Sequence, residues 1–419
     1  MALLLKNCRF LVTQDANRRI LEDIDVKISK GRIADIGKNL KGEPSETIDC
    51  SRSVVMPGLI NTHTHIAMAR LRGAADDILL EEFLEKTFEI DSHQSKKDVE
   101  DGALLGCLES IKFGTTCFAD LYYWEDAIAK SACSLGIRAN LSWACLDKEI
   151  TTQKGDPIDN CAKFIRDWKG GNELITPSVG LQGVYACSES TCARAKELAE
   201  KEDTIIHSHL SETRREVYEC GEKTGLRPVE LFEKRKLLSD RLLAAHCCWL
   251  TKPEMDKLAK GGVHVSHNPT SNLKLSSGGL APIPELLERG ANVSLGTDGA
   301  ASNNNLDLFK EMKLVALLHA NAKWDARLIP AQKALDLATR QGAKALGIDA
   351  GELSIGKLAD IIILPLENAH LLPCTKDNLI SNIVYSAEGN DVKTSIINGE
   401  IIMQDCVVSG EDKIIDKFI

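Results

Sequence analysis

The chain has 419 residues, and its 51 Lys and Arg against 61 Asp and Glu give a formal net charge of −10. This acidic balance argues against a nucleic-acid partner, which would require a basic face. No apolar run approaches the ~20 residues of a membrane-spanning helix, and the first residues do not resemble a signal peptide. With 14 cysteines and no secretory signal, we expect a cytoplasmic protein with reduced, mostly buried thiols and no membrane partner.

Both ends of the chain show the pattern of half-buried strands. In residues 1–56, apolar and charged side chains alternate, as at Ile24–Ile28. In residues 357–419, Asn398-Gly399 lies between apolar pairs, which is the strongest short hairpin signal. We expect these two segments to pair into one small β-sandwich.

Between residues 57 and 356, strand-like apolar runs alternate with helical patterns that carry start and stop signals. Eight such strands over ~300 residues predict an α/β fold of the (β/α)₈ TIM-barrel type. The rival, a doubly wound sheet, usually carries a Gly-rich phosphate turn after a strand, and this sequence contains no such turn. The eight predicted strands are Val54–Ile60, Thr115–Asp120, Ile137–Cys145, Ile175–Val184, Thr204–Leu210, Arg241–Cys247, Val263–His267 and Asn292–Thr297.

Acid, base and ligand side chains fall at the carboxyl ends of four predicted strands, where a barrel carries its active site. His63 and His65 close the first strand, His209 the fifth, His246 the sixth and Asp298 the eighth. Three imidazoles and one carboxylate make a ligand set that suits zinc or another divalent transition metal. The sequence therefore predicts a metal site.

Two further histidines lie on the predicted strands. His207 is two residues before His209, so its side chain can leave the same face of the strand one layer deeper. His267 ends the seventh strand. We expect His207 to be a structural histidine of the barrel interior, and His267 to be structural or to support the site.

Six short motifs stand out along the chain: Pro57–His65, His209–Glu212, Ala244–Cys247, Ser266–Leu275, Gly296–Asn304 and Gly356–Leu364. Together they resemble the amidohydrolase superfamily over essentially the whole chain. They are similar to those of the purine-nucleoside deaminases, and more closely to the 5-methylthioadenosine/S-adenosylhomocysteine deaminases and the archaeal 5′-deoxyadenosine deaminases.

This resemblance implies that His63, His65, His209 and Asp298 hold the metal ion. The fourth predicted strand has no lysine that could bridge two metals, so we expect one divalent ion per chain, zinc in preference to iron(II). Such an ion lowers the pKa of its water toward ~7 and supplies hydroxide at neutral pH. Asp298 would then take a proton from the water.

The same resemblance implies that Glu212 and His246 complete the catalytic set with Asp298. His246 would hold the hydroxide toward an aromatic carbon, and Glu212 would protonate a ring nitrogen. Glu212 would also contact the substrate, and we expect Ser302, in the last strand-end motif, to line the substrate pocket.

Several substrate positions depart from the family pattern. Phe83 stands where relatives carry Trp, Asp91 lies near their ribose-binding Glu with Glu89 as a rival, and Gln182 replaces a ribose-contacting His. Trp143 stands where relatives that bind S-adenosylhomocysteine carry Arg. Because indole cannot clamp a carboxylate as Arg does, we expect Trp143 to line a pocket for a short, apolar 5′ substituent.

The sequence therefore predicts hydrolytic deamination of an adenine nucleoside to the inosine analogue and ammonia. The expected substrates are 5′-deoxyadenosine and 5′-methylthioadenosine, with adenosine and S-adenosylhomocysteine as further candidates. The alternatives are deamination or hydrolysis of another amino-heterocycle (guanine, a pterin or a triazine) and, less favoured because every ligand is present, a non-catalytic scaffold. We expect a small-molecule nucleoside as partner and a homo-oligomer.

Overall fold

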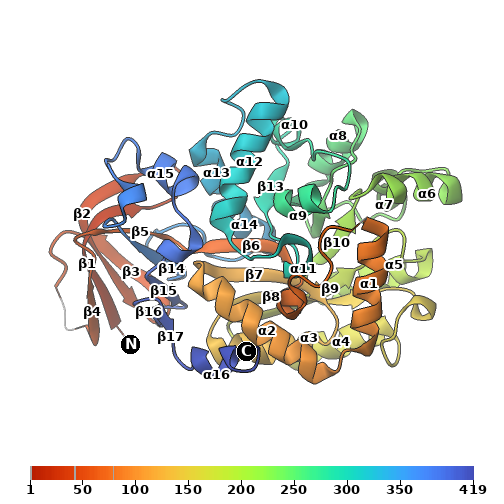
Figure 1. Ribbon diagram of the computed structural model, residues 1–419, viewed down its shortest axis with the longest axis horizontal. Helices are drawn as coiled ribbons and strands as arrows, with labels where there is room; N and C mark the ends of the chain where they lie inside the picture. Colours follow the sequence, from red (N-terminus) through yellow and green to blue (C-terminus); the bar gives the residue numbers. More distant parts are fainter. Residues whose placement is uncertain (1, 42–43, 79) are drawn as a thin grey trace.

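The computed structural model describes residues 2–41, 44–78 and 80–419. In this part of the chain, eight parallel strands follow one another in sequence order in a single sheet, with helices around it (Figure 1). These strands are β6 (Leu59–Thr64), β7 (Thr115–Tyr122), β8 (Arg138–Cys145), β9 (Ile175–Leu181), β10 (Ile206–Leu210), β11 (Leu242–His246), β12 (His264–His267) and β13 (Asn292–Leu295).

The sheet curves round so that its last strand meets its first. The backbone N–H of Asp298, just after β13, donates to the carbonyl of His63 in β6 over 2.9 Å. One layer below, the Thr62 hydroxyl donates to the Leu295 carbonyl over 2.9 Å. The predicted (β/α)₈ barrel is therefore confirmed, and its closure places two predicted site residues side by side.

Helices cover the outside of the barrel, and none of the described helices is long and apolar enough to cross a membrane. The α-helices are α1 (Leu80–His93), α2 (Lys96–Lys112), α3 (Glu125–Leu135), α4 (Pro157–Trp168), α5 (Glu189–Lys201), α6 (Arg214–Thr224), α7 (Pro228–Lys234), α8 (Lys252–Gly261), α9 (Pro269–Lys274), α10 (Ile283–Glu288), α11 (Ala300–Asn303), α12 (Leu308–Lys323), α13 (Ala331–Ala338), α14 (Arg340–Leu346), α15 (Leu379–Tyr385) and α16 (Glu411–Ile415). Short 3₁₀ helices are η1 (Ile66–Leu71), η2 (Lys148–Ile150), η3 (Ala369–Leu371) and η4 (Gly389–Asp391).

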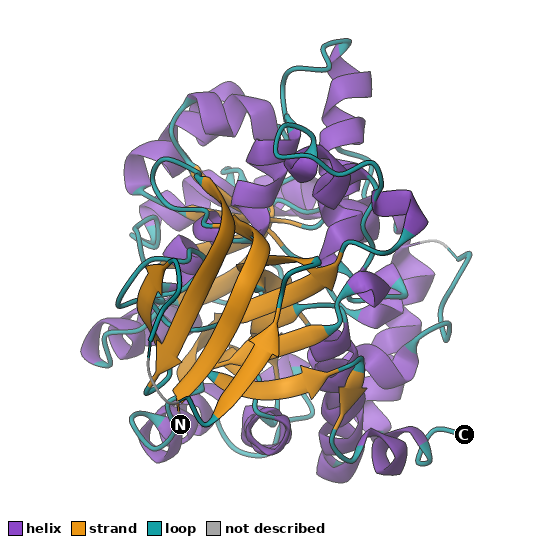
Figure 2. Ribbon diagram, turned by 90° about the vertical axis from the view of Figure 1, so that its left-hand side faces the viewer, coloured by secondary structure: helices purple, strands orange, loops and turns teal. Residues whose placement is uncertain are grey.

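The two ends of the chain share a second, mixed sheet beside the barrel, seen face-on in Figure 2. The N-terminal and C-terminal strands meet where β5 pairs antiparallel with β14, so the ends pair as expected. Part of the sheet has an apolar core of its own, whereas side chains such as Phe10, Met56 and Ile362 share the core of the barrel. Its described strands are β1 (Ala2–Val12), β2 (Ile20–Ser29), β3 (Arg32–Gly37), β4 (Glu46–Asp49), β5 (Ser53–Pro57), β14 (Ile361–Pro365), β15 (Thr394–Ile397), β16 (Glu400–Gln404) and β17 (Val407–Val408).

The predicted C-terminal hairpin is present. Antiparallel strands β15 and β16 are joined by Asn398 and Gly399, whose φ angles are 52° and 75°. Both residues have the left-handed backbone that a tight two-residue hairpin requires, which explains the Asn-Gly pair.

One predicted strand, Val54–Ile60, is in fact two strands in different sheets. β5 belongs to the terminal sheet and β6 opens the barrel, and Gly58 lies between them. A Cβ at Gly58 would lie 2.1 Å from the Thr116 hydroxyl, so only glycine permits this close passage. The unbroken apolar run hides this change of sheet, because the residues on both sides of Gly58 are buried.

All 14 cysteines are free thiols, and most are buried. Cys406 is exposed, and Cys133 and Cys374 are half-buried. The predicted reduced thiols are therefore present, with these exceptions to the expected burial.

Candidate active site

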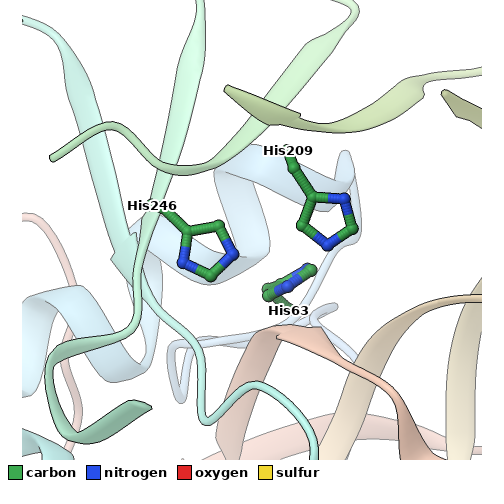
Figure 3. Close-up of side chains that lie close together, drawn as sticks. All are labelled: His63, His209 and His246. Carbon is green, nitrogen blue, oxygen red and sulfur yellow. The ribbon is translucent and has the colours of Figure 1, made fainter. Parts of the chain in front are cut away.

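Four histidines and an aspartate from the ends of four strands converge at the carboxyl end of the barrel. Figure 3 shows the rings of His63, His209 and His246 turned toward one another. The potential ligand atoms of these three residues lie within 4.8 Å of one another, and so do those of His63, His65 and Asp298. The Asp298 Oδ1 atom is 3.3 Å from Nε2 of His65 and 3.5 Å from Nε2 of His63.

Backbone carbonyls fix the orientation of two of these rings. The Nδ1 of His65 lies 2.6 Å from the Leu121 carbonyl, and the Nδ1 of His209 lies 2.8 Å from the Gln182 carbonyl. Because a carbonyl only accepts hydrogen bonds, each Nδ1 carries the hydrogen. Each Nε2 therefore presents a lone pair, and these two Nε2 atoms are 3.4 Å apart.

The fully buried His63 ring completes this arrangement. Its Nδ1 is 2.8 Å from Nε2 of His207, while its Nε2 has no hydrogen-bond partner among the described residues. A buried, unpartnered nitrogen beside other lone pairs and a carboxylate is costly unless something binds there. Burial also lowers the pKa of His63 and of His209 well below the usual value, which keeps both rings neutral. The donor set fits a divalent metal ion.

In His246 the hydrogen is on the other ring nitrogen than in His65 and His209. Its Nδ1 faces the side-chain Nδ2 atoms of Asn272 and Asn268, at 2.9 and 3.3 Å. Amide N–H groups donate, so Nδ1 accepts and the hydrogen of the neutral ring sits on Nε2. This Nε2 is 3.8 Å from a carboxylate oxygen of Glu212. The φ of His246 is 74°, a left-handed conformation that is rare for a non-glycine residue and typical of functional sites.

Asp298 is held as a carboxylate. Burial acts to raise its pKa, but the imidazoles around it, His63 first, hold that pKa well below the usual value. The Ser271 hydroxyl donates to Oδ2 over 2.6 Å, and the Gly299 N–H donates to Oδ1 over 2.8 Å. Like His246, Asp298 has a left-handed backbone, with a φ of 63°.

Glu212 lies in the turn after β10. The Ser211 and Glu212 N–H groups donate to the two carboxylate oxygens of Glu216 over 3.0 and 2.7 Å, which fixes the turn. Burial raises the pKa of Glu212 to about 8. Glu212 is therefore a protonated acid at neutral pH, three residues from His209.

A cavity of about 560 Å³ opens above this cluster, within the usual size range of small-molecule sites. Of the predicted substrate residues, Asp91, Gln182, Glu212 and Ser302 all line it. The Tyr122 hydroxyl donates to Asp91 over 2.7 Å.

Phe83 also lines the cavity, whereas Glu89, the rival of Asp91, is exposed and is not among the described lining residues. The structure thus favours Asp91 over Glu89 as the acid facing the cavity.

Trp143 does not line this cavity. Its neighbour Ala144 does, and alternate residues of a strand face opposite sides, so Trp143 points outward. There its ring packs 5.8 Å from that of Phe164 on α4. Its Nε1 donates to Oε1 of Gln153 over 2.8 Å, and it is Gln153 that lines the cavity. The expected pocket around Trp143 is therefore corrected: Trp143 supports the wall from behind.

A sequence profile of the Amidohydrolase family matches residues 54–402. The chain belongs to this family. It is 41% identical over 413 residues to a 5′-deoxyadenosine deaminase of Methanosarcina barkeri, covering 98% of this chain and 95% of that protein. It is also 41% identical to a 5-methylthioadenosine/S-adenosylhomocysteine deaminase of Thermococcus sibiricus, covering 96% of this chain and 94% of that protein.

Among solved structures, the fold of this amidohydrolase is similar to that of an adenosine deaminase from Xanthomonas campestris with bound zinc. The TM-score is 0.95 at 29% identity, covering 99% of this chain and 96% of that one. The zinc of that structure and the cluster of lone pairs described above together support a divalent metal in this amidohydrolase.

Sequence reasoning missed several residues that shape the site of this amidohydrolase. Ser271 and Asn272 lie inside a recognised motif, but nothing in their spacing shows which side chains they contact. Glu216 follows Glu212 by four residues, and this spacing alone does not show that its carboxylate accepts from the N–H groups of Ser211 and Glu212. Gln153 lies in an irregular loop after β8 and gave no signal.

Proposed function

We propose that this amidohydrolase hydrolyses the exocyclic amine of an adenine nucleoside, releasing ammonia and the inosine analogue. The observation that carries the proposal is the pairing of two proton donors beside the lone-pair cluster: the protonated Glu212 carboxyl and the Nε2–H of His246, 3.8 Å apart. The deaminases among its relatives support the same chemistry.

We propose His63, His65, His209 and Asp298 as the metal ligands, with one zinc ion per chain. His65 and His209 present Nε2 lone pairs, His63 an unpartnered Nε2 and Asp298 a carboxylate. His246 presents an N–H and is therefore left outside the set. A divalent ion bound there supplies hydroxide at neutral pH by lowering the pKa of its water toward ~7.

Around the ion, three side chains would move the protons. The Asp298 carboxylate takes a proton from the attacking water, and the His246 N–H orients the water oxygen toward C6 of the purine. The Glu212 carboxyl delivers its proton to the ring nitrogen N1 as the C6–O bond forms. The proton held by Asp298 then passes to the amine, the C6–N bond breaks and ammonia leaves. The hydroxyl proton returns to Glu212, C6 becomes a carbonyl carbon, and N1 keeps its hydrogen.

The cavity supports a substrate whose 5′ substituent carries no charge. Among the described lining residues, Arg215 is the one lysine or arginine, and its Nε donates to Glu219 over 2.6 Å. Phe88 and Ile150 add exposed apolar surface. A carboxylate buried here would be poorly paired, which is costly. We therefore propose 5′-deoxyadenosine and 5′-methylthioadenosine as the preferred substrates, with Asp91 and Gln182 binding the ribose hydroxyls.

A substrate panel tests this function. The purified, zinc-loaded protein is assayed for ammonia release from 5′-deoxyadenosine, 5′-methylthioadenosine, adenosine, S-adenosylhomocysteine, guanine and a pterin. We expect the first two to give the highest kcat/KM. A clear preference for guanine or the pterin would overturn the nucleoside assignment. If none of the compounds released ammonia, the proposed deamination would be wrong.

We also propose a homo-oligomer. Leu317 and Trp324 lie seven residues apart at the outer face and C-terminal end of α12, and both are exposed, Trp324 at 96%. Large exposed apolar side chains of this kind are common at protein interfaces. Light scattering on the wild type and on Trp324→Glu tests this: a monomeric wild type would contradict the proposal.

A further inference from the structure

His63 differs from the other two proposed imidazole ligands in what holds its Nδ1 atom. His65 and His209 each face a backbone carbonyl, at 2.6 and 2.8 Å. The Nδ1 of His63 instead faces Nε2 of His207, 2.8 Å away, with the two rings inclined at 77°. An imidazole can donate or accept at either nitrogen, so this contact does not by itself fix which nitrogen of His63 carries hydrogen.

The proposed metal site removes this freedom. A metal ligand needs a lone pair, and Nε2 of His63 lies 3.5 Å from Oδ1 of Asp298 with no hydrogen-bond partner among the described residues. When an ion is bound there, the hydrogen of His63 is therefore on Nδ1.

His207 is then the acceptor in this contact. Its Nε2 accepts from Nδ1–H of His63 over 2.8 Å, so the hydrogen of the neutral His207 ring is on Nδ1. His207 is fully buried in β10, and the Ser142 hydroxyl lies 3.5 Å from its Nδ1.

We propose that His207 is a positioning residue for the metal ligand His63. Its Nε2 accepts the hydrogen bond from Nδ1 of His63 and so favours the tautomer and orientation of His63 that bind a metal. This inference rests on the proposed metal site. The sequence predicts only a structural histidine at this position, and the proposal adds a role in orienting His63.

Two polar substitutions separate this role from mere filling of the barrel. In His207→Gln, the amide oxygen reaches the position of Nε2 and can accept from His63. In His207→Asn, the shorter amide reaches only the position of Nδ1, so it cannot accept from His63. The control is His267→Asn, because His267 is equally buried but has no hydrogen-bond partner among the described residues.

The readout is zinc affinity, measured by competition with a chromophoric chelator, together with the visible spectrum of the cobalt-loaded protein. Loss of a residue that orients a metal ligand typically weakens binding 10–100-fold. We expect a loss of about this size in His207→Asn with an altered cobalt spectrum, a loss of only a few fold in His207→Gln, and no change in His267→Asn. Thermal unfolding of each apo protein checks that the barrel is intact.

Equal zinc affinity in the two His207 variants would overturn the proposal, whether both keep the wild-type value or both lose it alike. Equality would mean that the acceptor facing His63 does not matter. A wild-type protein that binds no divalent ion would instead overturn the proposed metal site. The two failures are thus distinguishable without any measurement of activity.

Discussion

Ser271 holds Asp298 through a hydrogen bond of 2.6 Å from its hydroxyl to Oδ2. Ser271 lies in the short helix α9, which is in contact with the buried Glu311 on α12. The two carboxylate oxygens of Glu311 accept from the N–H of Thr270, over 3.1 Å, and from the side chain of Asn303, over 2.8 Å. Glu311 therefore joins α9 and α11 to α12 beside the proposed catalytic carboxylate.

Ser271→Ala should lower kcat/KM by roughly 10- to 100-fold at saturating zinc. A hydrogen bond to a charged group contributes ~1.5–3 kcal/mol, and each ~1.4 kcal/mol corresponds to a factor of ten. Ser277→Ala is the matched control, since Ser277 is also buried nearby but its hydroxyl has no partner among the described residues. Steady-state kinetics on both variants tests this, and equal effects would remove Ser271 from the site.

Glu212→Gln should keep zinc bound while turnover falls. Glutamine preserves the shape of the side chain but cannot deliver a proton, and general acid–base catalysis is typically worth ~10²–10⁴ in rate. The measurement combines kcat with metal content by elemental analysis. Near-normal turnover in the metal-loaded variant would exclude Glu212 as the acid.

The activity of the wild type should fall as the pH rises above about 8. Burial raises the pKa of Glu212 to about 8, so the carboxyl keeps its proton below that pH and loses it above. Since the proposed role needs the proton, kcat is full on the acid side of this value and is lost on the alkaline side. A pH profile checks this, and the residual activity of Glu212→Gln should lack the same alkaline fall.

Gln153→Arg should improve the use of S-adenosylhomocysteine relative to 5′-deoxyadenosine, by roughly tenfold in the ratio of kcat/KM. Gln153 lines the cavity, so an arginine there can pair with the carboxylate of the amino-acid tail, a contact worth ~1.5–3 kcal/mol. Kinetics with both substrates measures the ratio, and an unchanged ratio would mean that the 5′ tail does not approach this wall.

Trp143→Arg serves as the comparison for Gln153→Arg. It should destabilise the protein without changing the ratio of kcat/KM between S-adenosylhomocysteine and 5′-deoxyadenosine. Trp143 packs outside the barrel wall against Phe164 and is 8% exposed. Loss of a large buried ring costs ~3–5 kcal/mol, and the new charge would be poorly solvated there. Thermal unfolding measures the loss. A stable Trp143→Arg protein with improved use of S-adenosylhomocysteine would contradict the outward orientation.

Metal analysis should find about one zinc per chain. Exhaustive chelation should abolish activity, and one equivalent of zinc should restore it, since the proposed ligands form one cluster of four side chains. Two tightly held ions per chain after dialysis would refute the single-ion site.

The sequence by itself determined the barrel and the strand ends at which the site lies. Alternating strands and helices predict parallel strands whose carboxyl ends meet at one face. That rule brings His63, His209, His246 and Asp298 together before any contact is known. The Asn398-Gly399 hairpin was equally predictable, because its left-handed turn depends on those two residues alone.

Only the tertiary structure decided which way side chains face and which nitrogen of each imidazole is free. Strand alternation shows that Trp143 and Ala144 point to opposite sides, but not which side is the cavity. The polarity of the histidines depends on partners far away in the chain, such as the Leu121 carbonyl for His65 and the Asn272 amide for His246. A single sequence contains the donors and acceptors, but their pairing exists only after the strands have closed into a barrel.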